Sequence, residues 1–155
     1  MLDGDLLDEM LNICSRYPEA PKNFIQIELT ERIGDVEREI IAQIGRSIRE
    51  QGFLLGLDDF GSQYSSLSLL TYMKLDTIKL DKSLIWNLET SLNCRIMVKN
   101  IVRMCLELGI ECLAEGVETT KQLALLKDFG CTAAQGYLYS KPVPTAEFVE
   151  KYHSA

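Results

Sequence analysis

The feature that most constrains the fold is a regular alternation of short apolar runs with longer segments of helical periodicity. Five such runs occur in chain order, namely FIQIEL, FLLGLDD, DTIKLD, ECLAEG and AAQGYLY. Between the first two runs, branched apolar residues recur at the spacing of one helix face, at Ile33, Val36, Ile40, Ile44 and Ile48. A strand–helix repeat of this kind predicts a parallel sheet covered by helices.

Further helices are expected at 5–14, 65–73, 91–108, 121–129 and 146–152. Thr119 or Thr120 is a suitable N-cap for the fourth of these segments, and Thr145 for the fifth. At 155 residues and without a low-complexity tract, the chain is expected to be a single domain, 1–155. Two architectures fit this pattern, an open doubly wound sheet and part of a (β/α)8 barrel. A complete barrel takes about 250 residues, so the chain would supply about five of the eight units.

Composition excludes several classes of function. The formal net charge of -7 argues against a nucleic-acid polymer or an anionic membrane as a direct partner. No apolar run is long enough to span a bilayer. The five cysteines form no CxxC pair, so we interpret them as reduced core residues of a cytoplasmic protein. The single histidine, His153, lies near the end of the sequence, which argues against a histidine metal site or a catalytic triad.

Polar side chains collect on one face of the predicted sheet. Successive strand residues point to opposite faces, so Ile25 and Ile27 share one face, while Gln26 and Glu28 share the other. The same parity, applied to all five runs, places on one face Glu28, Asp58, Lys79, Asp81, Glu115 and Gln135. Most of these residues lie toward the carboxyl ends of strands, where the ligand sites of α/β folds form.

Several carboxylates on one rim repel each other unless cations or protons neutralise them. Oxygen ligands without histidine or thiolate favour Mg²⁺ or Mn²⁺. The adjacent Asp58 and Asp59 could each bind one of two metal ions about 3.5–4 Å apart, or share one ion. Lys79 would orient a water molecule or a phosphate oxygen. The set therefore predicts hydrolysis of a phosphodiester by metal-bound hydroxide.

Simpler interpretations remain open for each residue taken alone. An acid at a strand end is most often a solvated loop residue or a helix N-cap, and Asp81 alone would cap the turn at Lys82 and Ser83. Lys79 alone would be a surface lysine. The DFG triplet at 59–61 also occurs in protein kinases, but the sequence has neither their glycine-rich loop nor their HRD loop, which excludes that class. Agreement of parity over five strands favours the functional interpretation.

Five motifs resemble, in order and spacing, those of the EAL domain family, namely IELTE, LDDFGSQYSSL, IKLDKSLI, AEGVET and QGYLYSKPVP. The likeness covers nearly the whole chain from about Phe24 onward. The resemblance implies a modified TIM barrel and a Mg²⁺- or Mn²⁺-dependent phosphodiesterase. Such enzymes linearise the bacterial messenger cyclic di-GMP to pGpG.

The resemblance also implies a role for each matching residue. It makes Glu28, Asp58, Asp59 and Glu115 metal ligands, with Gln135 in the same shell. Lys79 would position the attacking water, with Glu115 beside it at the reacting centre and Asp81 supporting the lysine or the metals. Substrate binding or loop support is expected from Glu31, Ser62, Gln63, Glu118, Tyr137 and Pro142.

The sequence departs from the family pattern in two places. Gln63 replaces a glycine of the family loop DDFGTGYSSL, and it adds strain if that glycine uses positive φ; Ser62 is a milder change. The Glu-Ala-Leu motif, a nearby arginine and an asparagine ligand are absent, so we expect a truncated domain without the first three strands.

Two functions therefore stay open for this chain. One is a phosphodiesterase that is weak or inactive in isolation and competent when the missing strands are supplied. The other is a non-catalytic EAL-like module that binds cyclic di-GMP or a partner protein. In either case, open sheet edges favour a homodimer or completion by the missing strands.

Overall fold

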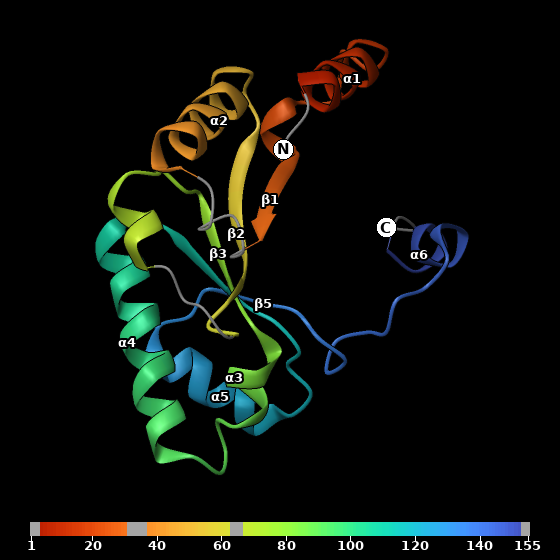
Figure 1. Cartoon of the computed structure of the whole chain (residues 1–155). Coiled ribbons are helices and arrows are strands. Elements are labelled where there is room, and N and C mark those ends of the chain that lie inside the picture. Colours follow the sequence, from red (N-terminus) through yellow and green to blue (C-terminus); the bar gives the residue numbers. More distant parts are fainter. Residues whose placement is uncertain (1–3, 31–36, 63–66, 153–155) are drawn as a thin grey trace.

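The computed structural model describes residues 4–30, 37–62 and 67–152. Its strands are β1 (Gln26–Thr30), β2 (Leu54–Phe60), β3 (Thr77–Leu80), β4 (Glu111–Ala114) and β5 (Ala133–Ala134). They form one parallel sheet in the order β1-β2-β3-β4-β5 (Figure 1). Each apolar run thus contains a strand, as predicted. Because the order never reverses, the sheet lacks the switch point of a doubly wound fold and is part of a TIM-like barrel.

The helices fall close to their predicted positions. They are α1 (Gly4–Ser15), α2 (Arg38–Glu50), α3 (Lys82–Trp86), α4 (Leu92–Leu108), α5 (Thr120–Phe129) and α6 (Thr145–Tyr152), with short 3-10 turns at η1 (Lys22–Phe24) and η3 (Leu67–Thr71). The helix expected at 65–73 is therefore a 3-10 turn where it is described, and α3 was not predicted. Ile33 and Val36 lie outside the described residues. Thr119 is the N-cap of α5, in a capping box with Gln122.

One face of the sheet packs on helices, as the parity predicts. Leu55, Leu57 and Ile78 point to this face and are fully or almost fully buried. They share the core with Ile41 of α2 and with Val98 of α4, and α2 and α4 lie on the same side of the sheet in Figure 1. All five cysteines are free, and Cys94, Cys105 and Cys112 are buried. The predicted residues of the opposite face are thereby left to form a site.

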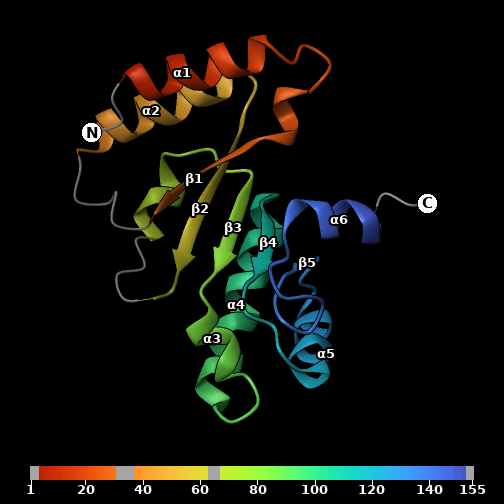
Figure 2. The ribbon, with the colours of Figure 1, turned by 90° about the vertical axis from the view of Figure 1, so that its right-hand side faces the viewer.

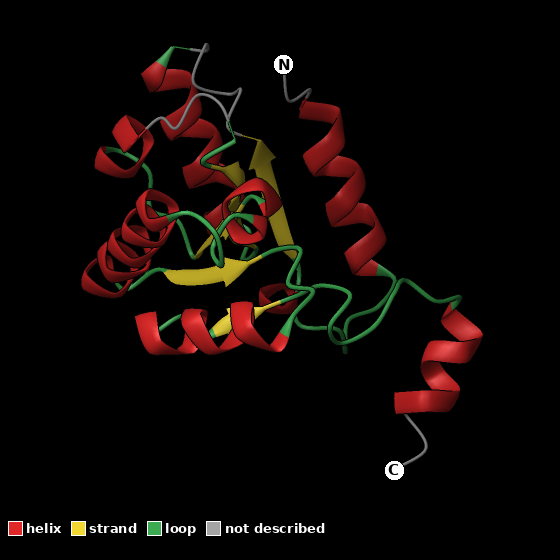
Figure 3. Cartoon of the chain, turned by 90° about the horizontal axis from the view of Figure 1, so that it is seen from below, coloured by secondary structure: helices red, strands yellow, loops and turns green. Residues whose placement is uncertain are grey.

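The strand directions fix where that site lies. In Figure 2 the arrows of β2 and β3 point to the end of the molecule that carries α3. The C-terminal helix α6 stands away from the sheet, as both Figure 1 and the view from below in Figure 3 show.

In the described part of the chain no helix has the length and apolar character needed to cross a bilayer.

Asp76 connects three elements at the opposite end of the sheet. Its Oδ2 atom accepts a hydrogen bond from the backbone N–H of Leu55 at 2.9 Å and an ion-paired hydrogen bond from Arg49 at the end of α2. Its carbonyl oxygen accepts from the N–H of Glu111, at the start of β4. Both side chains of the ion pair are largely buried, at 27% and 23% exposure. This residue therefore fixes the register of β2 and β4 around β3.

We predict that Asp76→Ala lowers the free energy of unfolding by about 2 kcal/mol, because it leaves a largely buried guanidinium and a strand N–H without their acceptor. Chemical denaturation followed by circular dichroism measures the change. Asp128→Ala, at an exposed aspartate of α5, is the matched control and should change stability by less than about 0.5 kcal/mol. Equal effects of the two substitutions would contradict the assigned role.

Candidate functional site

The carboxyl ends of the strands bring together acids that are far apart in the sequence, around Lys79 of β3. The Nζ atom of Lys79 lies 2.8 Å from Glu28 Oε2, 3.0 Å from Asp58 Oδ1 and 2.9 Å from Glu115 Oε1. These carboxylates come from β1, from β2 and from the residue after β4. The lysine side chain is only 11% exposed. Four of the residues expected on the polar face therefore form one compact cluster, namely Glu28, Asp58, Lys79 and Glu115.

The charge state of Lys79 follows from its neighbours. Burial lowers the pKa of Lys79, but hydrogen bonds to Glu28, Glu115 and Asp58 raise it by more, so that it lies well above the ordinary value for lysine. The ammonium therefore stays protonated at neutral pH. A permanently protonated lysine cannot act as a general base, but it can hold carboxylates and orient a water or phosphate oxygen.

A local distortion of β2 explains why two acids stand side by side in the sequence. In a regular strand, Asp58 and Asp59 would point to opposite faces. The pairing of β2 with β3 shifts register between Leu57 and Phe60, and Asp59 has a φ of 56°, the single positive value among described non-glycine residues. Carboxylate oxygens of Asp58, Asp59 and Glu115 consequently lie within 4.8 Å of one another. Aspartate is among the few residues that tolerate this backbone region.

This oxygen cluster fits a divalent cation. Asp58 Oδ1 is buried, and the described residue that balances its charge is Lys79, whose Nζ lies 3.0 Å away. The same ammonium also contacts Glu28 and Glu115, so one positive charge is shared among three carboxylates, and a further cation would balance the rest. A set of carboxylates without histidine or thiolate suits Mg²⁺ or Mn²⁺. Asp58, Asp59 and Glu115 are therefore the residues best placed to hold the metal, and Glu28 lies outside this group of three, in contact with Lys79.

Gln135 and Asp81 differ from their expected roles in detail. The side-chain amide of Gln135 donates to Glu115 Oε1 at 2.6 Å, so its observed contact orients the glutamate. Asp81 Oδ1 accepts from the N–H of Ser83 at 2.9 Å and caps α3, which is the alternative that the sequence left open. Support of Lys79 by Asp81 stays a prediction.

Two loops are fixed against each other next to Glu115. The N–H of Val117 donates to the carbonyl of Gln135, and the N–H of Leu138 donates back to the carbonyl of Val117, both at 3.0 Å. A methyl group at Gly136 would lie 2.2 Å from the Val117 carbonyl oxygen. Only glycine permits this approach, which holds the loop after β5 against the loop after β4.

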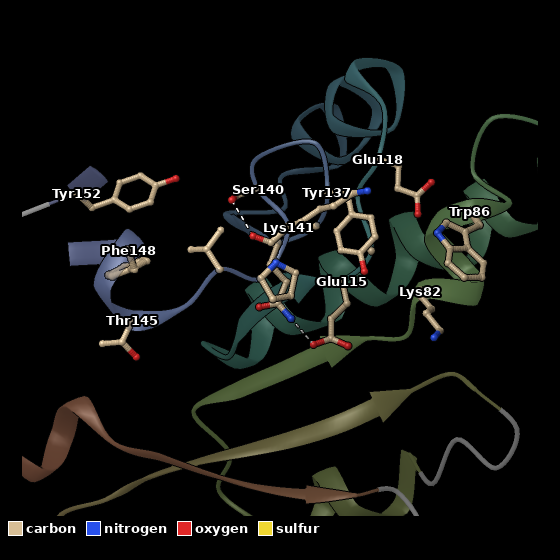
Figure 4. Close-up of a pocket in the computed structure, with 15 residues that line it drawn as sticks. Lys82, Trp86, Glu115, Glu118, Tyr137, Ser140, Lys141, Thr145, Phe148 and Tyr152 are labelled. Carbon is tan, nitrogen blue, oxygen red and sulfur yellow. Dashed lines mark hydrogen bonds between the residues drawn. The ribbon is translucent and has the colours of Figure 1, made fainter. Parts of the chain in front are cut away.

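A cavity of about 940 Å³ opens beside the cluster (Figure 4). Predicted residues on its wall are Glu115, Glu118, Gln135, Tyr137 and Pro142, and residues that the sequence analysis missed include Lys82, Trp86 and Lys141. Lys82 Nζ lies 5.4 Å from the ring centroid of Trp86, and Lys141 Nζ lies 5.6 Å from that of Tyr137. In each of these two pairs a cation lies near an aromatic ring, and Phe148 and Tyr152 add two further rings to the wall. Lys82, Trp86 and Lys141 were missed because α3 and the loop after β5 were not predicted to share a space.

The remaining predicted residues lie at the edge of the described chain. Ser62 is exposed in the turn after β2, where its N–H donates to the carbonyl of Asp59 at 3.1 Å. Glu31 and Gln63 lie outside the described residues.

The fold and the site define an α/β barrel-type domain with a cluster of carboxylates at the carboxyl ends of its strands. The family model of the EAL domain matches residues 1–142. The chain therefore belongs to the EAL domain family, as its motifs indicate.

Relatives and solved structures agree with this assignment. The chain is 37% identical over 132 residues to cyclic di-GMP phosphodiesterase NbdA of Pseudomonas aeruginosa, a match that covers 83% of the chain and 17% of that protein. The crystal structure of the EAL domain of Mycobacterium smegmatis DcpA matches with a TM-score of 0.91 and 27% identity, over 99% of this chain and 68% of that one. The manganese and cyclic di-GMP complex of Klebsiella pneumoniae BlrP1 matches with a TM-score of 0.78 and 34% identity, over 90% and 34%. The chain spans about a fifth of the length of the curated relatives that it matches.

We predict that Asp59→Asn weakens Mn²⁺ binding at least about tenfold, because it removes a charged ligand while keeping a side chain that tolerates positive φ. Isothermal titration calorimetry measures the affinity, and thermal unfolding of the metal-free protein is expected to stay unchanged within about 3 °C. Asp8→Asn, at an exposed aspartate of α1, is the control. Wild-type affinity in Asp59→Asn would exclude Asp59 as a ligand.

Proposed function

We propose that this chain carries the metal centre and part of the nucleotide cavity of a phosphodiesterase that hydrolyses cyclic di-GMP to pGpG. The observation that carries the proposal is the cluster of Asp58, Asp59 and Glu115 beside Lys79 in an EAL domain, with Glu115 also on the wall of a large cavity. BlrP1, solved as a manganese and cyclic di-GMP complex, and NbdA, named for the hydrolysis, support the choice of metal and substrate.

The charge of the site supports a requirement for two divalent ions. Four carboxylates (Glu28, Asp58, Asp59 and Glu115) and one ammonium (Lys79) carry a formal charge of -3. Such a site repels a phosphodiester anion. One divalent ion leaves a charge of -1, and only a second makes the site positive. The ions would be held by Asp58, Asp59 and Glu115 and would supply a Lewis acid and an acidified water.

The residues of the chain have distinct tasks in this proposal. Lys79, which contacts Glu28, Asp58 and Glu115, donates to the nucleophilic water or to a phosphate oxygen. Gln135 holds Glu115 in place through its side-chain amide. In the cavity, Trp86 and Tyr137 offer aromatic faces to the guanine bases, and Lys82 and Lys141 offset the charge of the phosphates.

The edges of the sheet are expected to associate with further protein strands. Among the described residues, β1 and β5 are the outer strands of the sheet, and each pairs on one side only. Unpaired strand edges favour association, so a second copy of the chain, or the further strands that the family resemblance implies, would cover them. A cytoplasmic location suits a substrate that is an intracellular messenger.

A turnover assay tests the catalytic claim. With Mn²⁺ and cyclic di-GMP, we expect slow formation of pGpG, abolished by EDTA and at least about 100-fold slower in Glu115→Gln, which loses a charge next to the reacting phosphate. Glu111→Gln makes the same change at the opposite end of β4 and should keep the wild-type rate. Chromatography of the products gives both rates. Equal rates in all variants would indicate a contaminating enzyme, and binding without product would favour a non-catalytic module.

Nucleotide binding has a separate readout, because Trp86 is the only tryptophan of the chain and is 48% exposed on the cavity wall. We predict saturable quenching of its fluorescence by cyclic di-GMP in the presence of Mg²⁺. Tyr137→Ala should weaken the affinity at least about fivefold if its ring stacks on a base. The control is Tyr17→Ala, at an exposed tyrosine in the turn after α1, distant in the sequence from Tyr137. Unchanged fluorescence at millimolar nucleotide would contradict binding in this cavity.

A further inference from the structure

Glu28 has to reach across the sheet to meet Lys79. It lies on β1, an outer strand, whereas Lys79 lies on β3, with β2 between them. Neighbouring strands are about 4.8 Å apart, so the side chains must span about two strand spacings. The Glu28 side chain is also 37% exposed, in contrast to the 11% of Lys79. A flexible, partly solvated glutamate on an outer strand needs a second contact to keep one orientation.

Gln26 supplies this second contact. It lies two residues before Glu28, on the same face of β1, and its Nε2 atom donates to Glu28 Oε1 at 3.2 Å. The other carboxylate oxygen, Oε2, accepts from Lys79 at 2.8 Å. The carboxylate is therefore held at both oxygens, by a neutral amide on one side and by an ammonium on the other.

Gly56 makes room for the Gln26 amide. Gly56 is the register partner of Glu28 on β2, and a methyl group there would lie 2.7 Å from Gln26 Nε2 and 3.0 Å from its Cδ. Since Gly56 has no side chain, the amide of Gln26 lies flat over the strand and reaches Glu28. The backbone of Gly56 does not have a positive φ, so its conformation alone would not require glycine. Glycine is therefore needed at position 56 because the Gln26 side chain occupies the space where a methyl group would lie.

We propose that Gln26 is a positioning residue, which orients the Glu28 carboxylate toward Lys79 and the metal cluster, and that Gly56 is needed to seat it. This inference deepens the proposed function, and it rests on that function only for its effect on metal binding. The contact itself requires no metal, so the two claims are separable by experiment.

Two independent substitutions remove the contact. Gln26→Met keeps the length of the side chain but cannot donate, and Gly56→Ala displaces the amide, which is the free end of a flexible side chain. Gln43→Met, at an exposed glutamine of α2, is the matched control. Circular dichroism and thermal unfolding verify that each variant is folded.

The first measurement uses the metal-free protein. The ¹⁵N chemical shift of the Lys79 ammonium, read through its Cε protons and assigned with Lys79→Met, reports whether Glu28 still holds the lysine. We expect this signal to shift in Gln26→Met and in Gly56→Ala, to shift no further in the double variant, and to stay unchanged in Gln43→Met. In a Glu28→Gln background, Gln26→Met should leave the Lys79 signal in place, because Gln26 acts through Glu28. An unchanged signal in both single variants would overturn the proposal.

The second measurement is Mn²⁺ affinity by isothermal titration calorimetry. We expect a loss of about tenfold in Gln26→Met and in Gly56→Ala, the effect typical of residues that orient a metal ligand, and the same loss in the double variant. Wild-type affinity in both variants would overturn the link from Gln26 to the metal site while leaving the proposed function intact. Absence of Mn²⁺ binding by the wild-type protein would instead overturn the proposed function, and the Lys79 signal would still decide the role of Gln26.

Discussion

The Lys79 ammonium is the one charge that lets three acids meet at the strand ends. Glu28, Asp58 and Glu115 would repel each other at their observed separation if no cation stood between them. Placing that cation on β3, near the middle of the sheet, lets it reach acids from both neighbouring strands and from β1 beyond. The site can therefore fold as a preformed cluster, before any metal binds.

Much of this arrangement could be predicted from the sequence, because strand parity is a strong physical constraint. Glu28, Lys79 and the packed apolar face followed from alternation alone. Asp59 was expected to share the metal site with Asp58, but alternation does not account for this, because a regular strand would turn it away from Asp58. Its approach depends on the register shift of β2 and on positive φ at Asp59, and a backbone distortion of this kind leaves no periodic signal in the sequence.

Contacts between loops could also not be predicted from the sequence. Parity placed Gln135 beside the acids but could not show that its amide binds Glu115. Asp81 had two interpretations, and the short helix α3, which was not expected, made it an N-cap. The same helix brings Trp86 to the cavity wall. Side chains on short loops and turns depend on tertiary packing, which no local pattern encodes, and the cavity is lined by the loops after β4 and β5 together with residues of α3 and α6.

Glycine positions show how closely the backbone determines the chemistry of the site. Gly136 permits the loop after β5 to touch Val117, which keeps Gln135 next to Glu115. Gly56 permits Gln26 to lie over β2, next to Glu28. Because Gly56 on β2 has no side chain, an amide of β1 reaches Glu28, and because Gly136 has none, an amide of the same loop stays next to Glu115. The two glutamates that contact Lys79, one on β1 and one directly after β4, are thus each oriented by a glutamine. A site oriented in this way needs little rearrangement to exchange part of its lysine contacts for a divalent ion.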